Sequence, residues 1–228
     1  MPARNSRKLY YENGYYHIYN RGVEKRKIFL FQQDYAVFLS YLKEYLLPKD
    51  EKGLLERLAD PATSSIEKNK ILRLLRLNNF NGEITLHAYC LMPNHFHFFI
   101  KQKSAGSIDK FMNSFCTRYT MYFNKKYDRV GSLYQGVYKA LSVENEPQFI
   151  YLSKYIHKQA LALQGEALQD QPSSYKDYIG ERKTDWIQPW EVLSYFSKTN
   201  SNLSYESFVN EYPDDKEQTL INEIALED

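Results

Sequence analysis

The chain has 228 residues, a hydrophobic fraction of 43% and a charged fraction of 25%, values that are ordinary for a globular protein. Its 9 glycines and 8 prolines exclude a collagen-like or low-complexity chain. We find no signal-peptide core and no run of about 18 apolar residues, so membrane insertion is not expected. Cys90 and Cys116 lie in segments with a buried pattern, which favours free thiols and a cytoplasmic location.

Charge is unevenly distributed along the chain. The formal net charge is only +2, but residues 1–159 carry +11 and residues 160–228 carry −9. A basic region that is also rich in tyrosine favours a partner with a phosphate backbone. An ordinary solvated surface would give the same composition. The acidic remainder could shield the basic region or simply favour solubility.

The first half of the chain predicts a strand, a helix and an insertion. Residues 15–20 alternate in the manner of a strand and end at Arg21-Gly22. Apolar residues at helical spacing follow from Asp34, which we expect to be the N-cap. Residues 48–83 are irregular apart from one amphipathic helix over 64–77. We therefore interpret about 48–80 as a helical insertion.

The second half predicts the rest of a compact domain and a tail. Strands beginning at Ile84 and His95 form a hairpin around Pro93-Asn94. An amphipathic helix follows at 107–127, then a loop with a short strand within 131–143, and a second long helix at 147–163. After a polar linker at 169–174 we expect three short helices, at 186–196, 205–209 and 216–226.

The order of these elements predicts the fold class and the domains. It is that of an α+β ferredoxin-like sandwich, an antiparallel sheet with helices on one face. We expect a catalytic domain over 1–165 and an acidic, mostly helical C-terminal extension over 166–228.

Two histidines mark a candidate metal site. His95 and His97 are separated by one residue on a predicted strand, so their imidazoles lie on one face. Two adjacent imidazoles can hold a divalent cation, although histidines also occur on polar sheet faces without a metal. Cys90 is poorly placed by this pattern to join them.

A helix supplies the other candidate groups. Tyr155 and Gln159 are four residues apart and therefore share a helix face. If this face covers the histidines, the amide oxygen can complete the metal site and the phenol can act as a nucleophile. A half-buried tyrosine and a surface amide would show the same spacing.

Several segments together resemble a known family. The sequence HFH, within LMPNHFHFF, is similar to the His-hydrophobic-His (HUH) motif of single-tyrosine transposases, including REP-associated tyrosine transposases. HIYNRGVEKRKIF, RYTMYFNKKY, GSLYQGVYKA, YIHKQAL and SSYKDYIG resemble further segments of that family, so the resemblance spans about residues 15–180.

The resemblance implies roles for individual residues. It makes His95 and His97 metal ligands, Gln159 a further ligand, and Tyr155 the nucleophile that forms a 5′-phosphotyrosine. The expected cofactor is Mg²⁺ or Mn²⁺. Gln159-Ala160 replaces the family's common Asn-Pro, which keeps an amide oxygen. Tyr151, one turn earlier, is the alternative nucleophile.

The resemblance also implies a DNA partner. The expected substrate is single-stranded or hairpin DNA, which a transposase cleaves and rejoins, and the family permits an active site within one chain or across a homodimer. Cationic candidates for DNA contact are Arg21, Arg118, Lys125, Lys126, Arg129 and Lys139. Two other functions remain open: a hairpin-binding protein without catalysis, and a metal-dependent nuclease that uses water.

Overall fold

The fold is built on a four-stranded antiparallel sheet. A computed structural model describes residues 8–161, 172–211 and 219. The strands are β1 (Tyr15–Arg21), β2 (Ile84–Met92), β3 (His95–Gln102) and β4 (Lys139–Val143). Their order in the sheet is β2-β3-β1-β4, and each neighbouring pair is antiparallel. This order confirms the predicted ferredoxin-like α+β fold.

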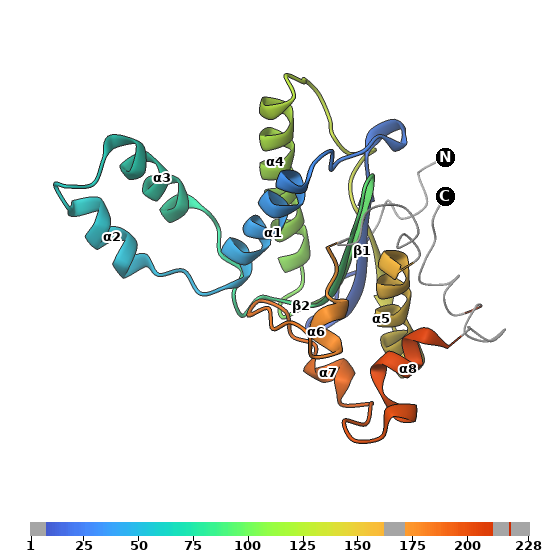
Figure 1. Cartoon of the computed structure of the whole chain (residues 1–228). Coiled ribbons are helices and arrows are strands. Elements are labelled where there is room, and N and C mark those ends of the chain that lie inside the picture. The colour runs from blue at the N-terminus through green and yellow to red at the C-terminus, as the bar shows by residue number, and fades with distance from the viewer. Residues whose placement is uncertain (1–7, 162–171, 212–218, 220–228) are drawn as a thin grey trace.

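Helices cover both faces of the sheet. Helices α1 (Gln32–Leu46) and α4 (Ser107–Lys126) lie on one face, and α5 (Glu146–Leu161) lies on the other (Figure 1). Side chains alternate accordingly along β3: Phe96 and Phe98 join the α1–α4 core, whereas Phe99 packs with α5. The α5 face is a layer beyond the single helical face expected from sequence.

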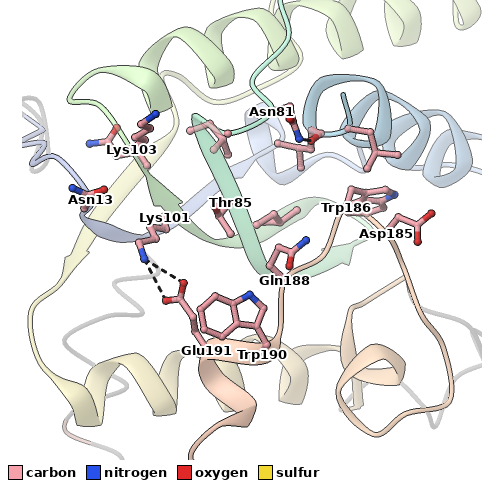
Figure 2. Close-up of a pocket in the computed structure, with 16 residues that line it drawn as sticks. Asn13, Asn81, Thr85, Lys101, Lys103, Asp185, Trp186, Gln188, Trp190 and Glu191 are labelled. Carbon is pink, nitrogen blue, oxygen red and sulfur yellow. Dashed lines mark hydrogen bonds and ion pairs between the residues drawn. The ribbon is translucent and has the colours of Figure 1, made fainter. Parts of the chain in front are cut away.

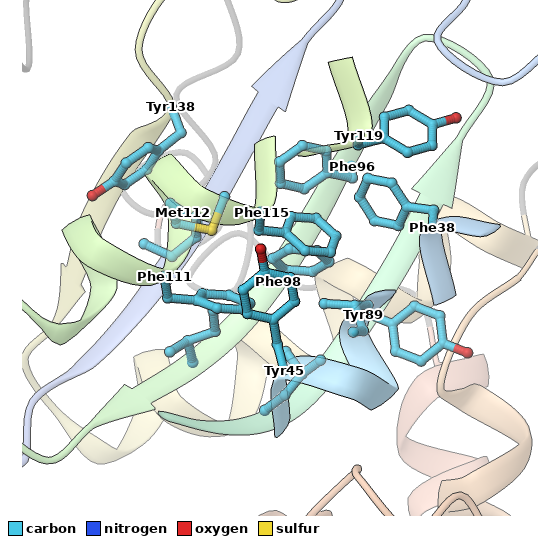
Figure 3. Packing of buried hydrophobic residues seen from close by; sticks show 14 of the residues in the cluster. Phe38, Tyr45, Tyr89, Phe96, Phe98, Phe111, Met112, Phe115, Tyr119 and Tyr138 are labelled. Carbon is cyan, nitrogen blue, oxygen red and sulfur yellow. The ribbon is translucent and has the colours of Figure 1, made fainter. Parts of the chain in front are cut away.

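The larger core is aromatic. It joins β3 to the facing helices through rings such as Phe38 of α1, Phe98 of β3 and Phe115 of α4 (Figure 3). Phe38 and Phe115 meet edge to face with their centroids 4.7 Å apart, a favourable geometry for aromatic pairs. This packing holds the sheet rigid beneath the face that carries the histidines.

Asp34 connects α1 to α4. It is the third residue of α1 instead of the expected N-cap, because the helix begins at Gln32. Its buried carboxylate accepts hydrogen bonds from the backbone amides of Leu30 and Phe31, at 2.8 and 3.0 Å. It also accepts from Lys126 Nζ at 2.6 Å. One carboxylate thus caps α1 and anchors the end of α4.

The insertion forms a helical hairpin. Helices α2 (Glu51–Ala59) and α3 (Ser65–Arg76) extend away from the sheet (Figure 1). The predicted amphipathic helix corresponds to α3, while α2 was not expected from sequence. Ile71 is the one residue of these two helices in the buried class, so the hairpin contributes little to the core.

The segment 172–211 packs onto β2 and α5. It contains α6 (Tyr175–Tyr178), α7 (Trp190–Leu193) and α8 (Tyr205–Asn210). Leu91 N donates to Pro172 O and Ser174 N donates to Tyr89 O, both at 3.0 Å, which covers the edge of β2. The predicted helices at 186–196 and 205–209 correspond to α7 and α8. Residues 169–171 of the predicted linker lie outside the described residues, as does the predicted helix at 216–226 apart from residue 219.

The segment 172–211 also contacts the C-terminal end of β3. Lys101 Nζ and Glu191 Oε1 form an ion pair at 3.2 Å (Figure 2). Two 3-10 turns, η1 (Val23–Lys25) and η2 (Ser201–Leu203), complete the assigned elements. Within the described ranges, no helix is long and apolar enough to cross a membrane.

Candidate active site on the α5 face of the sheet

The two histidines of the motif lie beside a third histidine and a tyrosine from β1. Tyr19 is the register partner of His97. His17 stacks on His97 with ring centroids 5.1 Å apart, and the ring of Tyr19 stacks on His97 with centroids 5.8 Å apart. His17 and His97 are both fully buried. The antiparallel pairing of β1 with β3 therefore builds an aromatic, imidazole-rich surface beneath α5.

Hydrogen bonds fix the orientation of both motif histidines. His95 Nδ1 lies 2.6 Å from Asn94 Oδ1 and, because that oxygen can only accept, Nδ1 carries the proton. His97 Nδ1 lies 2.8 Å from His17 Nε2. In both residues Nδ1 is engaged, so Nε2 is the nitrogen suited to ligate a cation. Such outer partners commonly orient metal-binding histidines.

Tyr155 covers these histidines from α5. Its ring packs edge to face on His97 with centroids 5.5 Å apart, and on His17 at 5.7 Å. Only 8% of Tyr155 is exposed. The helix thus brings the tyrosine predicted from spacing to the histidines predicted from strand alternation.

The predicted donors, two imidazoles and an amide oxygen, would suit a divalent cation of the magnesium or manganese class. Within the described part of the chain, no group of three or more His, Cys, Asp and Glu side chains could hold a metal. A site at His95 and His97 would therefore need a ligand of another type. Gln159 lies one turn beyond Tyr155 on α5 and is the residue predicted to offer an amide oxygen as the third donor. Open positions would remain for water or substrate oxygens.

Cys90 lies closer to this face than its sequence pattern predicts. It is the register partner of His97 in β2 and belongs to the buried cluster under α5. Its thiol lies 3.7 Å from Met92 Sδ. Burial raises the pKa of the Cys90 thiol above its ordinary value, so the thiolate needed for metal binding is disfavoured.

The alternative nucleophile has a different environment. The ring of Tyr151 packs against Phe208 of α8, with centroids 5.3 Å apart. Tyr119 of α4 is buried and donates to Ile28 O at 2.7 Å. The ring of Tyr155, by contrast, packs on His17 and His97.

The predicted DNA-contacting cations divide into two groups. Arg21 is the register partner of His95, and Lys139 is that of Tyr19, so both belong to the α5 face. Arg118 instead contacts Glu44 at 2.5 Å and lies 3.7 Å from the centre of the Tyr41 ring.

The other three cations lie near the end of α4. Lys126 pairs with Asp34 at 2.6 Å, and Arg129 donates to Asn124 Oδ1 at 2.9 Å. Lys125 is exposed. Arg118 and Lys126 therefore connect α4 to α1, and the structure does not gather all six cations into one surface.

A pocket at the other end of β3 is separate from this site. It has a volume of about 460 Å³, and its lining includes Lys101, Lys103, Trp186 and Trp190 (Figure 2). None of the predicted metal ligands or nucleophiles lines it. Its position at the C-terminal end of β3 separates it from the motif histidines at the N-terminal end.

Two residues of the histidine network were not predicted from the sequence. His17 and Asn94 engage the Nδ1 atoms of His97 and His95. The alternation of β1 places His17 on the same face as Tyr19. Only the β1–β3 register, which is a tertiary feature, brings His17 to His97.

Distant structural similarities accompany this geometry. A REP-associated tyrosine transposase bound to a REP hairpin is 13% identical, with a TM-score of 0.48 and coverage of 88% of this chain and 96% of that chain. A protein of Deinococcus radiodurans assigned as a transposase is 17% identical, with a TM-score of 0.28 and coverage of 68% and 97%. No curated protein matches the sequence.

One family model matches part of the sequence. Residues 63–159 match the model of the family described as IS200-like transposases. The matched segment includes the strand with His95 and His97 and the helix with Tyr155 and Gln159. Residues 63–159, less than half of the chain, are therefore similar to IS200-like transposases.

Proposed function

We propose that this protein is a transposase that cleaves and rejoins single-stranded DNA through a covalent 5′-phosphotyrosine at Tyr155. The observation that carries the proposal is the packing of Tyr155 against His17 and His97, at ring distances of 5.7 and 5.5 Å. A tyrosine beside two oriented imidazoles fits nucleophilic attack at a metal-held phosphate. The family match supports the DNA substrate.

The covalent step exchanges one phosphoester for another. The Tyr155 oxygen forms a bond to phosphorus while the bond from phosphorus to the 3′ oxygen of the preceding nucleotide breaks. The phenol gives up its proton, and the leaving oxygen becomes a free 3′-hydroxyl. A 3′-hydroxyl from another strand can then attack the phosphotyrosine and release Tyr155. The two steps conserve the ester bond, so rejoining needs no nucleotide cofactor.

His95, His97 and Gln159 would hold the divalent cation. When bound, such a cation neutralises charge on the non-bridging phosphate oxygens and makes phosphorus more electrophilic. The protein orients the ligands: Asn94 holds His95, and His17 holds His97. Because α5 is packed on the sheet, Tyr155 and Gln159 keep their positions relative to these histidines.

The basic region would hold the DNA. Arg21 and Lys139 flank the histidines on the α5 face and can contact phosphates on either side of the cleaved bond. A hairpin would present an unpaired flank to this face. Exposed tyrosines near it could stack on unpaired bases.

A denaturing gel tests the proposal. We would incubate the protein with Mn²⁺ and a labelled hairpin that has single-stranded flanks, and we expect a covalent protein–DNA band. Tyr155→Phe should abolish the band, whereas Tyr151→Phe, the matched control on the same helix, should retain it. Cleaved DNA without an adduct would indicate a nuclease that uses water, and binding without cleavage would indicate a hairpin-binding protein. Either result would contradict the proposal.

A further inference from the structure

The helix that carries Tyr155 is tied to its own sheet at its N-terminal end. β4 ends at Val143 and α5 begins at Glu146, so these two residues can be no more than about 11 Å apart. Gln148 closes the connection: its Oε1 accepts from Glu144 N at 2.8 Å, and its backbone N donates to Asn145 Oδ1 at 2.9 Å. The start of α5 therefore stays beside β4 of the same chain.

His157 fixes the other half of α5. It lies two residues after Tyr155 and two before Gln159, and its side chain is fully buried. His157 Nδ1 lies 2.6 Å from the Tyr205 hydroxyl of α8, and His157 Nε2 lies 2.7 Å from Ser174 Oγ. A neutral imidazole has one donor and one acceptor, and each hydroxyl can serve as either, so both ring nitrogens are satisfied. The segment 172–211 thus holds the imidazole of His157 from two sides.

Ser174 carries this contact to the sheet. It is fully buried, and its Oγ accepts from Tyr89 N of β2 at 2.9 Å, while Ser174 N donates to Tyr89 O at 3.0 Å. The residue after Tyr89, Cys90, is the register partner of His97. A short chain of hydrogen bonds therefore links the helix that carries Tyr155 to the strand next to the motif histidines.

α8 supports the same side of α5 over two turns. It lies beside α5 (Figure 1), and the ring of Phe208 packs on Tyr151 with centroids 5.3 Å apart. Lys154 Nζ lies 4.5 Å from the centre of the Phe208 ring, and Lys158 Nζ donates to Glu211 O at 2.6 Å. These contacts begin before Tyr155 and end after it, so α5 cannot carry Tyr155 away from the sheet without breaking them.

We propose that the segment 172–211 is a positioning part of the active site: through His157 and α8 it holds Tyr155 over the histidines of its own chain. The inference rests on the proposed function, because that function makes Tyr155 the nucleophile. Ser174, Tyr205 and His157 act through α5 and are positioning residues. Since both halves of α5 are held on one sheet, each chain cleaves DNA with its own Tyr155, also where two copies associate.

Single-turnover kinetics test the positioning role. Tyr205→Phe and Ser174→Ala each remove one hydroxyl partner of His157 and change the shape of the side chain little. The rate of adduct formation would be measured with saturating Mn²⁺ and saturating hairpin DNA, and DNA affinity by anisotropy with EDTA present. We expect each variant to form the adduct about 10- to 100-fold more slowly, because a displacement of about 1 Å can cost a reaction on the order of 100-fold. DNA affinity should not change.

Tyr45→Phe is the matched control. Tyr45 is also fully buried, and its hydroxyl lies 2.7 Å from Ser114 Oγ, between α1 and α4 on the opposite face of the sheet. The control should lower the melting temperature about as much as Tyr205→Phe but keep the wild-type rate, at a temperature where all variants stay folded. Equal losses of rate in Tyr45→Phe and Tyr205→Phe would show that stability sets the rate, and would overturn the positioning role.

Complementation tests whether Tyr155 acts within its own chain. His97→Ala keeps the nucleophile but lacks a predicted metal ligand, whereas Tyr155→Phe keeps the ligands but lacks the nucleophile. The two variants would be co-expressed, so that any mixed dimers can form, and incubated with Mn²⁺ and hairpin DNA. We expect no adduct. An adduct would mean that Tyr155 of one chain reaches the histidines of another, and would overturn the inference.

The outcomes separate the two proposals. If the wild-type protein forms the adduct but Tyr205→Phe and Ser174→Ala form it equally fast, the positioning role is wrong and the proposed function stands. If the wild-type protein forms no adduct, the proposed function fails and this inference fails with it.

Discussion

Replacement of His17 tests the positioning of the predicted metal ligands. His17→Phe keeps a flat ring next to Tyr19 and His97 but removes the nitrogen that lies 2.8 Å from His97 Nδ1. His97 then loses the partner that fixes its ring. Loss of such an outer partner typically weakens metal binding by 10- to 100-fold, or about 1.4–2.8 kcal/mol. We expect a loss of this size in Mn²⁺ affinity.

The same change should also affect stability. His97 is fully buried, and loss of a hydrogen bond to a buried polar group costs about 1–3 kcal/mol. Stability alone could therefore be mistaken for an effect on the site. Metal affinity has to be compared between variants that lose similar amounts of stability.

His87→Phe is the matched control. His87 is also fully buried and engages its Nδ1 with Gln188 O at 2.8 Å. Electron paramagnetic resonance of free Mn²⁺ would give the affinity, and urea unfolding would give the stability. We expect both variants to lose stability but only His17→Phe to lose Mn²⁺ affinity. Unchanged Mn²⁺ affinity in His17→Phe, or equal losses in the two variants, would refute the positioning role.

Three further predictions concern the fold and the cationic surface. Asp34→Asn should lower the free energy of unfolding by about 3–5 kcal/mol, the usual cost of removing one partner of a buried ion pair. The control Asp128→Asn, at an exposed residue with a φ of 49° that asparagine also adopts, should change this free energy by less than about 0.5 kcal/mol. Similar urea midpoints for the two variants would contradict the prediction. Burial opposes ionisation of Asp34, but hydrogen bonds from Lys126, Tyr127 and the backbone lower its pKa below the ordinary 3.8. The stabilising contribution of the Asp34 carboxylate should therefore be present above pH 3.8 and be lost as the pH falls through the lowered pKa. In acid unfolding, the stabilities of wild type and Asp34→Asn should converge as the pH is lowered. Arg21→Met should reduce the slope of log K against log salt concentration for single-strand binding by about 0.7, the value of one phosphate contact. Arg118→Met should leave that slope unchanged and lower the melting temperature, because the Arg118 guanidinium contacts Glu44 and Tyr41. The opposite assignment of the two effects would refute the division of the cations.

Local sequence patterns predict most of the elements but not their layers. Strand alternation at 15–20 and 95–102 and helical spacing at 107–127 correspond to β1, β3 and α4. The helix α5 lies on the opposite face of the sheet from α1 and α4 because of the way the chain crosses the sheet. The spacing of apolar residues within a helix does not specify which face of the sheet that helix covers. The start of α1 was placed at Asp34 because a carboxylate near a helix start suggests a cap. The same carboxylate caps the helix equally well from its third residue.

The sequence predicts the individual residues of the site but not the contacts between them. Strand alternation places His95 and His97 on one face, and helix spacing places Tyr155 with Gln159. The ring contacts between Tyr155 and His97 join the two sets. The partnership of His17 with His97 requires strand register across 80 residues of sequence. Likewise, the use of Arg118 and Lys126 to hold α4 on α1 could not be inferred from charge alone.

Mass spectrometry of the trapped adduct tests the central claim most directly. The protein would react with Mn²⁺ and hairpin DNA, be digested with nuclease and protease, and be searched for a nucleotide linked to a peptide. We expect the nucleotide on Tyr155, joined through its 5′-phosphate, with a free 3′-hydroxyl on the released strand. A nucleotide on Tyr151 or another residue, or cleaved DNA with no modified peptide, would contradict the account.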